Sequence, residues 1–293
     1  MNKYILSCCS TADLSKEHFQ RRDIKYVCFH YAIDGEEYLD DLGESISPDE
    51  FYDRMKNGAE TRTSQVNISE YVEFFSKYLD QGLDIVHVSL SSGLSGTINS
   101  ARNAALIVRE RYPDRRIEIL DSLCASSGYG LLMDAAADRR DAGLSMDELV
   151  QWIEENELNV NHWFFSTDLT SYVKGGRISK TAAVFGGILE ICPLLNMDEQ
   201  GRLTPRSKVR TKKKVIREIA EKMFALADND TDYSGKCYIS HSACREDAEA
   251  VAELVEQHFP KLDGKVEIYP VGTTIGSHTG PGTVALFFWG DGR

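Results

Sequence analysis

The chain has 293 residues, enough for about two domains of ordinary size, and its hydrophobic (42%) and charged (27%) fractions are those of a globular protein. Its net charge of −13 at pH 7 argues against a general nucleic-acid-binding protein, because such proteins need cations to neutralise phosphates. No stretch approaches the ~20 consecutive apolar residues of a membrane span, and the first apolar run is too short for a signal-peptide core, so the sequence predicts a cytoplasmic protein.

Short apolar runs alternate with amphipathic segments in the first half of the chain, which is the pattern of βαβ units and a parallel sheet. Strands are predicted at residues 4–6, 26–29, 85–90 and 117–120. Helices are predicted at residues 70–79, 97–111 and 125–140, and a further helix begins after Ser145, where Glu148 completes a capping box.

The second half has a different character. Residues 194–197 and 202–210 flank a turn at residues 199–201 and predict an antiparallel hairpin. An apolar helix interrupted by two glycines is predicted at residues 181–191, and a long helix at about residues 215–224. The remaining predicted strands are residues 160–166, 238–239, 266–268 and 285–288.

The change of pattern near residue 158 predicts two domains. Residues 1–158 would form an N-terminal α/β domain with a parallel sheet, and residues 159–293 a second α/β domain with a mixed or antiparallel sheet.

The seven cysteines form no C-x-x-C pair, and Cys8 and Cys9 are adjacent, so we expect small buried side chains rather than disulfides; a reactive thiol site is the alternative. The paired Cys/His spacing of a zinc site is absent, and neither a metal nor a cofactor is predicted.

A Ser/Gly-rich segment, residues 89–97, joins a predicted strand to a predicted helix. Ligands in open α/β sheets bind beyond the carboxyl ends of strands, and a helix N-terminus at that place favours an anion. The segment therefore predicts an anion site that includes Ser95 and Gly96; an ordinary serine-rich connection is the alternative.

Two other segments are weaker candidates. Residues 61–65 form a second hydroxyl cluster, in which Thr63 and Ser64 could bind a ligand or simply cap the following helix. Residues 272–282 contain too many glycines for a core element, so they predict a loop that positions His278, although a loop histidine is often only solvated.

Known enzyme motifs fit poorly. The sequence contains neither a Walker-type phosphate loop nor an H-E-x-x-H zinc motif, and the segment around Ser95 lacks the G-x-S-x-G spacing of a nucleophile elbow. A hydrolase or acyltransferase that uses Ser95 and His278 remains an alternative, and it requires the base to lie within reach of the serine.

Positive charge is concentrated between Arg202 and Arg217, where six further lysines and arginines occur and no acid. In an acidic protein this segment could be a docking surface for a phosphate-bearing or acidic partner. A solvated helix face and a nucleic-acid-linked regulator are the alternatives, and the overall acidity disfavours the second.

Taken together, five segments resemble the DegV family of bacterial proteins, and the resemblance extends over essentially the whole chain. Each segment is weak alone, but their order along an α/β half followed by a mixed half is specific. They are residues 63–65, 92–97, 174–179, 207–210 and 278–282.

The resemblance implies a protein that binds one long-chain fatty acid in a buried apolar tunnel and is not itself a catalyst. Hydroxyls matching Thr63 and Ser95 would hold the carboxylate, with Gly96 and His278 nearby; Ser64 and Thr279 belong to the same motifs. Some family members present the acid to a separate ATP-dependent fatty acid kinase and then carry the acyl phosphate. The positions expected to face that partner are Arg177, Arg206, Lys208 and Arg210.

The sequence departs from the family pattern at two places. Cys8 and Cys9 stand where the first strand of the family usually ends in an Asp-Ser pair, and Val66 stands where proline usually follows the Thr-Ser-Gln motif. The first departure predicts a change of polarity near the head group of the ligand.

Overall fold

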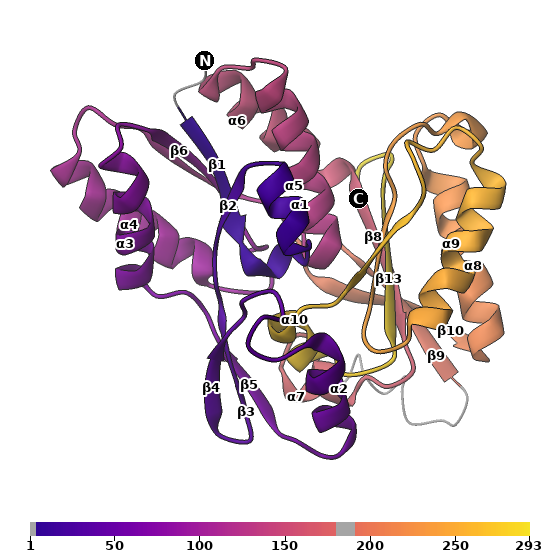
Figure 1. The fold of residues 1–293 in the computed structure, drawn as a ribbon. Helices are drawn as coiled ribbons and strands as arrows, with labels where there is room; N and C mark the ends of the chain where they lie inside the picture. The colour runs from indigo at the N-terminus through magenta and orange to yellow at the C-terminus, as the bar shows by residue number, and fades with distance from the viewer. Residues whose placement is uncertain (1–3, 180–190) are drawn as a thin grey trace.

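The computed structural model describes residues 4–179 and 191–293, which form three β-sheets flanked by helices (Figure 1). The first sheet has the strand order β2-β1-β6-β7, and every neighbouring pair is parallel, which confirms the predicted N-terminal parallel sheet. Its strands are β1 (Tyr4–Cys9), β2 (Ile24–Val27), β6 (Asp84–Ser89) and β7 (Ile117–Asp121).

Helices cover this sheet, and side-chain caps define several of their starts. Asn67 and Glu70 form a capping box at the start of α3, and Ser145 and Glu148 form the predicted one at the start of α6. The helices of this half are α1 (Lys16–Arg21), α3 (Ile68–Leu79), α4 (Thr97–Arg111), α5 (Ser126–Asp141) and α6 (Met146–Asn156).

A small antiparallel sheet was not predicted. It has the order β4-β3-β5 and consists of β3 (His30–Ile33), β4 (Glu36–Leu39) and β5 (Thr61–Ser64), with α2 (Pro48–Lys56) between β4 and β5. The hydroxyl cluster that could have been a helix cap is therefore the strand β5, whose residue Thr63 pairs with Tyr31 of β3.

The third sheet has six strands in the order β10-β9-β8-β13-β11-β12. Only the pair β11-β12 is parallel, so the predicted mixed sheet and the predicted β9-β10 hairpin are confirmed. The strands are β8 (Val160–Ser166), β9 (Ile191–Met197), β10 (Leu203–Arg210), β11 (Tyr238–His241), β12 (Glu267–Pro270) and β13 (Thr283–Trp289).

The helices α8 and α9 lie side by side on one face of this sheet, and its other face is turned toward α5 (Figure 1). Because α5 also belongs to the parallel-sheet half, it is shared by the two halves of the molecule. The helices of this half are α7 (Thr170–Lys174), α8 (Lys212–Leu226), α9 (Arg245–His258) and α10 (Thr273–Thr279), and short 3₁₀ turns are η1 (Ser10–Ala12), η2 (Glu157–Asn159) and η4 (Asp230–Asp232).

The chain passes from the first half to the six-stranded sheet where β8 begins, and we propose the domain division near residue 158 for that reason. Residues 181–190 of the predicted apolar helix lie outside the described residues, and Ile191 begins β9. Among the helices of the described ranges, none has the length and apolar character needed to cross a bilayer.

Candidate functional site

A cavity of about 450 Å³ lies between the parallel-sheet half and the six-stranded sheet. This volume falls within the range of about 300–1,000 Å³ that is usual for small-molecule sites. The apolar part of its lining comes from both halves of the molecule and includes Phe29, Leu90, Leu94, Ala125, Phe164, Met197, Leu203, Val271, Ile275, Ala285 and Phe287.

Side chains alternate between the two faces of β8 and β13. One face of the six-stranded sheet can therefore line the cavity, while the other face packs against helices. Phe164 of β8 and Ala285 of β13 are partners in the ladder, and both line the cavity. Their neighbours Phe165 and Leu286 point to the opposite face and pack in the core beneath α8 and α9.

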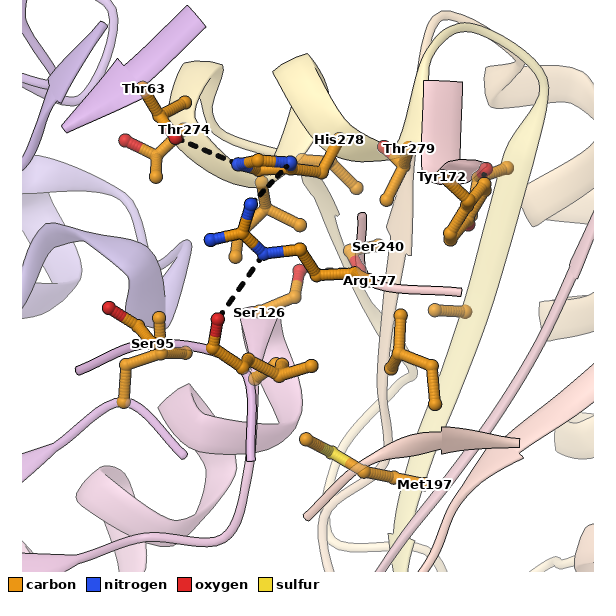
Figure 2. Close-up of a pocket in the computed structure, with 18 of the residues that line it drawn as sticks. Thr63, Ser95, Ser126, Tyr172, Arg177, Met197, Ser240, Thr274, His278 and Thr279 are labelled. Carbon is orange, nitrogen blue, oxygen red and sulfur yellow. Dashed lines mark hydrogen bonds between the residues drawn. The ribbon is translucent and has the colours of Figure 1, made fainter. Parts of the chain in front are cut away.

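Polar side chains gather at the partly exposed end of the cavity, which we call the mouth. Thr63 Oγ1 of β5 lies 2.8 Å from His278 Nε2 of α10, and the Arg177 guanidinium lies 3.4 Å from His278 Nδ1 (Figure 2). Arg177 Nε also donates to the Leu94 carbonyl oxygen at 3.3 Å. Arg177 thus connects the motif that follows α7 to the loop that precedes α4.

The direction of hydrogen bonding in this chain follows from its donors. A guanidinium can only donate, so His278 Nδ1 accepts, and in a neutral imidazole Nε2 then carries the hydrogen and donates to Thr63 Oγ1. The hydroxyl hydrogen of Thr63 is left to donate to a ligand. Burial, reinforced by the charge of Arg177, lowers the pKa of His278 to about 4, so the ring is neutral near pH 7.

The position of His278 also depends on a glycine. A Cβ atom at Gly175 would lie 2.2 Å from His278 Nδ1, so only glycine lets the backbone after α7 approach the imidazole this closely. The predicted loop around His278 is wrong in one respect, because residues Thr273–Thr279 form the short helix α10. The glycines at the two ends of this helix, Gly272 and Gly280, allow close contact with neighbouring segments and do not form an open loop.

The serine-rich segment ends at the mouth, as its position between β6 and α4 predicts. The Thr97 amide donates to Ser95 Oγ at 3.2 Å, and Gly96 occupies the N-cap position of the 15-residue helix α4. The amide groups of this first turn and the positive end of the helix therefore lie beside the cavity. The Gln65 side chain packs against Gly96 and donates to Ser100 Oγ at 3.0 Å.

The predicted ligand-binding residues come from three segments that are distant in the sequence, and the structure places all of them along one cavity. They are Thr63, Ser64, Ser95, Gly96, His278 and Thr279.

Comparisons with known proteins show the family of this chain. The family model described as "Uncharacterised protein, DegV family" matches residues 9–291. The chain belongs to the DegV family.

It is 38% identical to a DegV domain-containing protein of Clostridium perfringens over 291 residues, which cover 99% of each chain. Two solved structures are similar over nearly their whole length. One is a stearic acid-binding protein of Eubacterium ventriosum, with 27% identity, 97% coverage of each chain and a TM-score of 0.85. The other is DegV of Bacillus subtilis, described as a fatty acid binding protein, with 26% identity, 99% coverage of this chain, 100% of that chain and a TM-score of 0.82.

Neither Cys8 nor Cys9 of this DegV-family chain is among the described residues that line the cavity. Both are fully buried in the core of the parallel-sheet half, where burial raises the pKa of each thiol. Cys9 takes part in the core through its amide, which donates to the Tyr129 hydroxyl at 3.0 Å. The Cys9 thiol also lies 3.4 Å from the Tyr71 hydroxyl, so both cysteines belong to the buried core and neither belongs to the described cavity wall.

The predicted partner-facing residues divide into two groups in the DegV fold. Arg177 lines the cavity mouth, although its side chain is still partly exposed. Arg206, Lys208 and Arg210 are exposed on β10, while Val209 between them packs in the core beneath α8. Side chains alternate along a strand, so Lys208 and Arg210 point away from that core.

Several cavity residues were not predicted. Gln65, Ser126, Ser240 and Thr274 line the DegV cavity beside the residues discussed above. Gln65 belongs to the Thr-Ser-Gln motif, and that motif could have indicated it. Within the described ranges, no three His, Cys, Asp or Glu side chains are grouped as metal ligands.

Proposed function

We propose that this chain binds a single long-chain fatty acid, with the hydrocarbon chain in the cavity and the carboxylate at the mouth. The observation that carries the proposal is the distribution of polarity. A largely apolar cavity between the two halves has Thr63, Ser95, Arg177 and His278 at one end. The fatty-acid binding named for the structurally similar proteins of E. ventriosum and B. subtilis supports it.

The hydrocarbon chain supplies most of the binding energy. About 16 methylene-sized units buried at ~0.8 kcal/mol each give on the order of 13 kcal/mol gross. The lost translational freedom of the ligand and the ordering of its chain consume much of this. The carboxylate therefore needs only a few good hydrogen bonds to fix its position.

The mouth offers those hydrogen bonds and one positive charge. The Thr63 hydroxyl, oriented by the neutral His278 ring, can donate to a carboxylate oxygen, and Ser95 and the Gly96 amide lie at the same end. Arg177 adds a guanidinium, which the sequence alone places only on a partner surface. Hydrogen bonds to charged groups contribute about 1.5–3 kcal/mol each.

We further propose that the protein presents the bound acid to a fatty acid kinase and then carries the acyl phosphate. Two features support this proposal. The carboxylate end of the cavity is its partly exposed end, where a second protein can reach it, and Arg206, Lys208 and Arg210 form an exposed basic row on β10. A row of cations can dock an acidic partner surface and raise the rate of encounter.

The alternative is a hydrolase or acyltransferase that uses Ser95 as the nucleophile. The geometry disfavours it, because His278 Nε2 is directed at Thr63 and the hydrogen bonds of the described residues include none between His278 and Ser95. A serine nucleophile requires a base within hydrogen-bond reach. Turnover of a p-nitrophenyl ester that is abolished by Ser95→Ala would revive this alternative.

The test of the proposal is the lipid content of the purified protein. We expect native mass spectrometry to show one fatty acid per chain, and solvent extraction to release it. The delipidated protein should then bind palmitic or oleic acid with a stoichiometry of one. Extraction without any fatty acid, together with no binding of either acid, would show that the cavity has another ligand.

A further inference from the structure

A second polar group lies in the wall of the cavity, separate from the mouth. Ser126, the first residue of α5, and Ser240 of β11 both line the cavity. They are 6% and 0% exposed, which places them well inside, whereas Thr63 and Ser95 remain partly exposed. Figure 2 shows the two serines close together and apart from Thr63.

Part of the cavity wall beside Ser240 is apolar. Ser240 pairs with Ala285 of β13 in the sheet ladder, and Ala285 and Phe287 continue the cavity wall on that strand. The Ser240 hydroxyl has one partner, Ser126 Oγ at 3.0 Å, and an unsubstituted hydrocarbon chain offers no partner to its remaining hydrogen-bonding function.

The two hydroxyls are the end of a hydrogen-bond chain that begins at a buried acid. Ser126 Oγ is hydrogen-bonded to Asp13 Oδ2, and Ser240 Oγ lies 3.0 Å from Ser126 Oγ. Asp13 is 5% exposed, and burial together with the charge of Asp40 raises its pKa well above the usual value. Asp13 and Ser126 both have positive φ angles, of 47° and 51°; glycine and sometimes Asp adopt this conformation, but it is unfavourable for serine.

This series of hydrogen bonds leaves one hydrogen-bonding function of the Ser240 hydroxyl unused. If the hydrogen bonds run toward Asp13, the Ser240 hydroxyl donates to Ser126 and its lone pairs are left for a ligand. If they run from a protonated Asp13, Ser240 accepts from Ser126 and its hydrogen is left for a ligand. A hydroxyl group on the ligand both donates and accepts, so it satisfies Ser240 in either direction.

We propose that Ser126 and Ser240 recognise an oxygen substituent on the hydrocarbon chain, so that the preferred ligands are fatty acids hydroxylated within the chain rather than unsubstituted ones. This inference rests on the proposed binding of a fatty acid at this site. Sites built to hydrogen-bond a substrate hydroxyl discriminate strongly against analogues without it, because the partner of the hydroxyl is left buried and unpaired.

The experiment compares stearic acid with 10-hydroxystearic and 12-hydroxystearic acid, titrated into the delipidated full-length protein. At least one hydroxylated acid should bind about tenfold more tightly than stearic acid. Ser240→Ala should weaken the binding of that acid about tenfold and leave stearic acid unchanged or bound more tightly. Ser126→Ala should act in the same direction, and Ser7→Ala, which removes a fully buried hydroxyl of β1 outside the cavity wall, should change neither ligand.

The outcomes separate the two proposals. Equal affinity of the wild-type protein for all three acids, or an equal loss for all three in Ser240→Ala, would overturn the inference and show that the serines only join the two halves of the molecule. Failure of the wild-type protein to bind any of the acids would instead overturn the proposed function.

Discussion

Thr63 Oγ1 and His278 Nε2 lie 2.8 Å apart although 215 positions separate the two residues in the chain. The contact joins β5 of the small antiparallel sheet to α10, and it closes the cavity mouth from both halves of the molecule. Thr63 and His278, which were only weak candidates in the sequence, therefore form one hydrogen-bonded pair. The hydrogen of the Thr63 hydroxyl remains available to a ligand.

Removal of both hydroxyls at the mouth should weaken the binding of a fatty acid without unfolding the protein. In the variant Thr63→Ala/Ser95→Ala two donors to the carboxylate are lost, and we expect the affinity for palmitic acid to fall by about 10–100-fold or more. Fluorescence or calorimetric titration of the delipidated protein measures this effect. Ser92→Ala, an exposed serine of the same loop, is the matched control and should bind normally. Unchanged affinity in the double variant would remove these residues from the site.

The charge of Arg177 should matter for a carboxylate and not for an uncharged head group. We expect Arg177→Ala to lower the affinity for palmitic acid about 10–100-fold, since a charge-assisted hydrogen bond is lost, and to change the affinity for 1-hexadecanol little. Lys174→Ala removes an exposed cation three positions earlier, which pairs with Glu60 and does not line the cavity, and it should affect neither ligand. A parallel loss for acid and alcohol would mean that Arg177 only shapes the mouth.

The parallel sheet could be predicted because its central strands are buried on both faces. The run Ile85–Val86–His87–Val88 is buried throughout, and such a run reads as a continuous apolar strand. The small antiparallel sheet was missed because β3 and β4 are short and partly exposed. Asp34-Gly35, which have φ angles of 53° and 86° between these strands, are a hairpin signal that could have identified them.

The cavity wall could not be predicted from the same patterns. Phe164 and Phe165 are adjacent apolar residues of one strand, yet one lines the cavity and the other packs beneath α8. The sequence pattern shows that both faces of this strand are buried, but it does not show that one of them lines a cavity. The hydroxyl and histidine motifs indicated the mouth because small polar residues and glycines are unusual in a core. The position of Arg177 depends on the meeting of α7, α10 and the loop before α4, which no local pattern contains.

The length of the cavity should be adjustable at Ala285. Ala285→Phe places a ring in the cavity rather than in the core, so we expect the affinity for stearic acid to fall at least tenfold while lauric acid still binds. Leu286→Ala, the next residue, faces the opposite core and should lower the free energy of unfolding by about 2–5 kcal/mol without changing the preference for chain length. Titrations with both acids and urea denaturation measure the two effects, and equal losses for the two acids in Ala285→Phe would show that Ala285 does not limit the length of the bound chain.

The stability of the delipidated protein should fall in mild acid, partly because of His278. Its pKa is lowered from 6.5 to about 4 by burial and by Arg177, so between these pH values the unfolded state binds more protons than the folded state. The free energy of unfolding therefore decreases as the pH falls through this window, and this group contributes on the order of 2 kcal/mol of the decrease at pH 5.

His278→Gln removes that contribution and keeps a polar side chain. The difference in the free energy of unfolding between pH 7 and pH 5, measured by urea denaturation, should therefore be smaller in the variant. His87, whose pKa burial lowers to about 3, and the buried acids Asp13 and Asp40, whose pKa values are raised, are present in both proteins, so their effects cancel in the comparison. An identical difference in both proteins would show that His278 keeps its ordinary pKa in the folded state.

The basic row on β10 should serve a partner and not the ligand. Arg206 is held by Asn196, to which its Nε donates at 2.7 Å, and neither Arg206 nor Lys208 is among the described residues that line the cavity. Charge reversal in Arg206→Glu/Lys208→Glu should therefore leave the affinity for palmitic acid unchanged. If a fatty acid kinase docks on this row, repulsion should slow phosphorylation of the bound acid by tenfold or more, and the effect should shrink as salt is added.

The assay combines the lipid-loaded protein with a bacterial fatty acid kinase and follows ATP consumption. The variant Lys77→Glu/Arg102→Glu makes the same change of net charge on α3 and α4, and it should be phosphorylated at the rate of the wild-type protein. Equal slowing in both double variants would indicate a long-range effect of net charge rather than a docking surface. Loss of palmitic acid binding in a folded Arg206→Glu/Lys208→Glu protein would show that the row supports the lipid site itself, because the exposed cations would then be coupled to the cavity through β9 and β10.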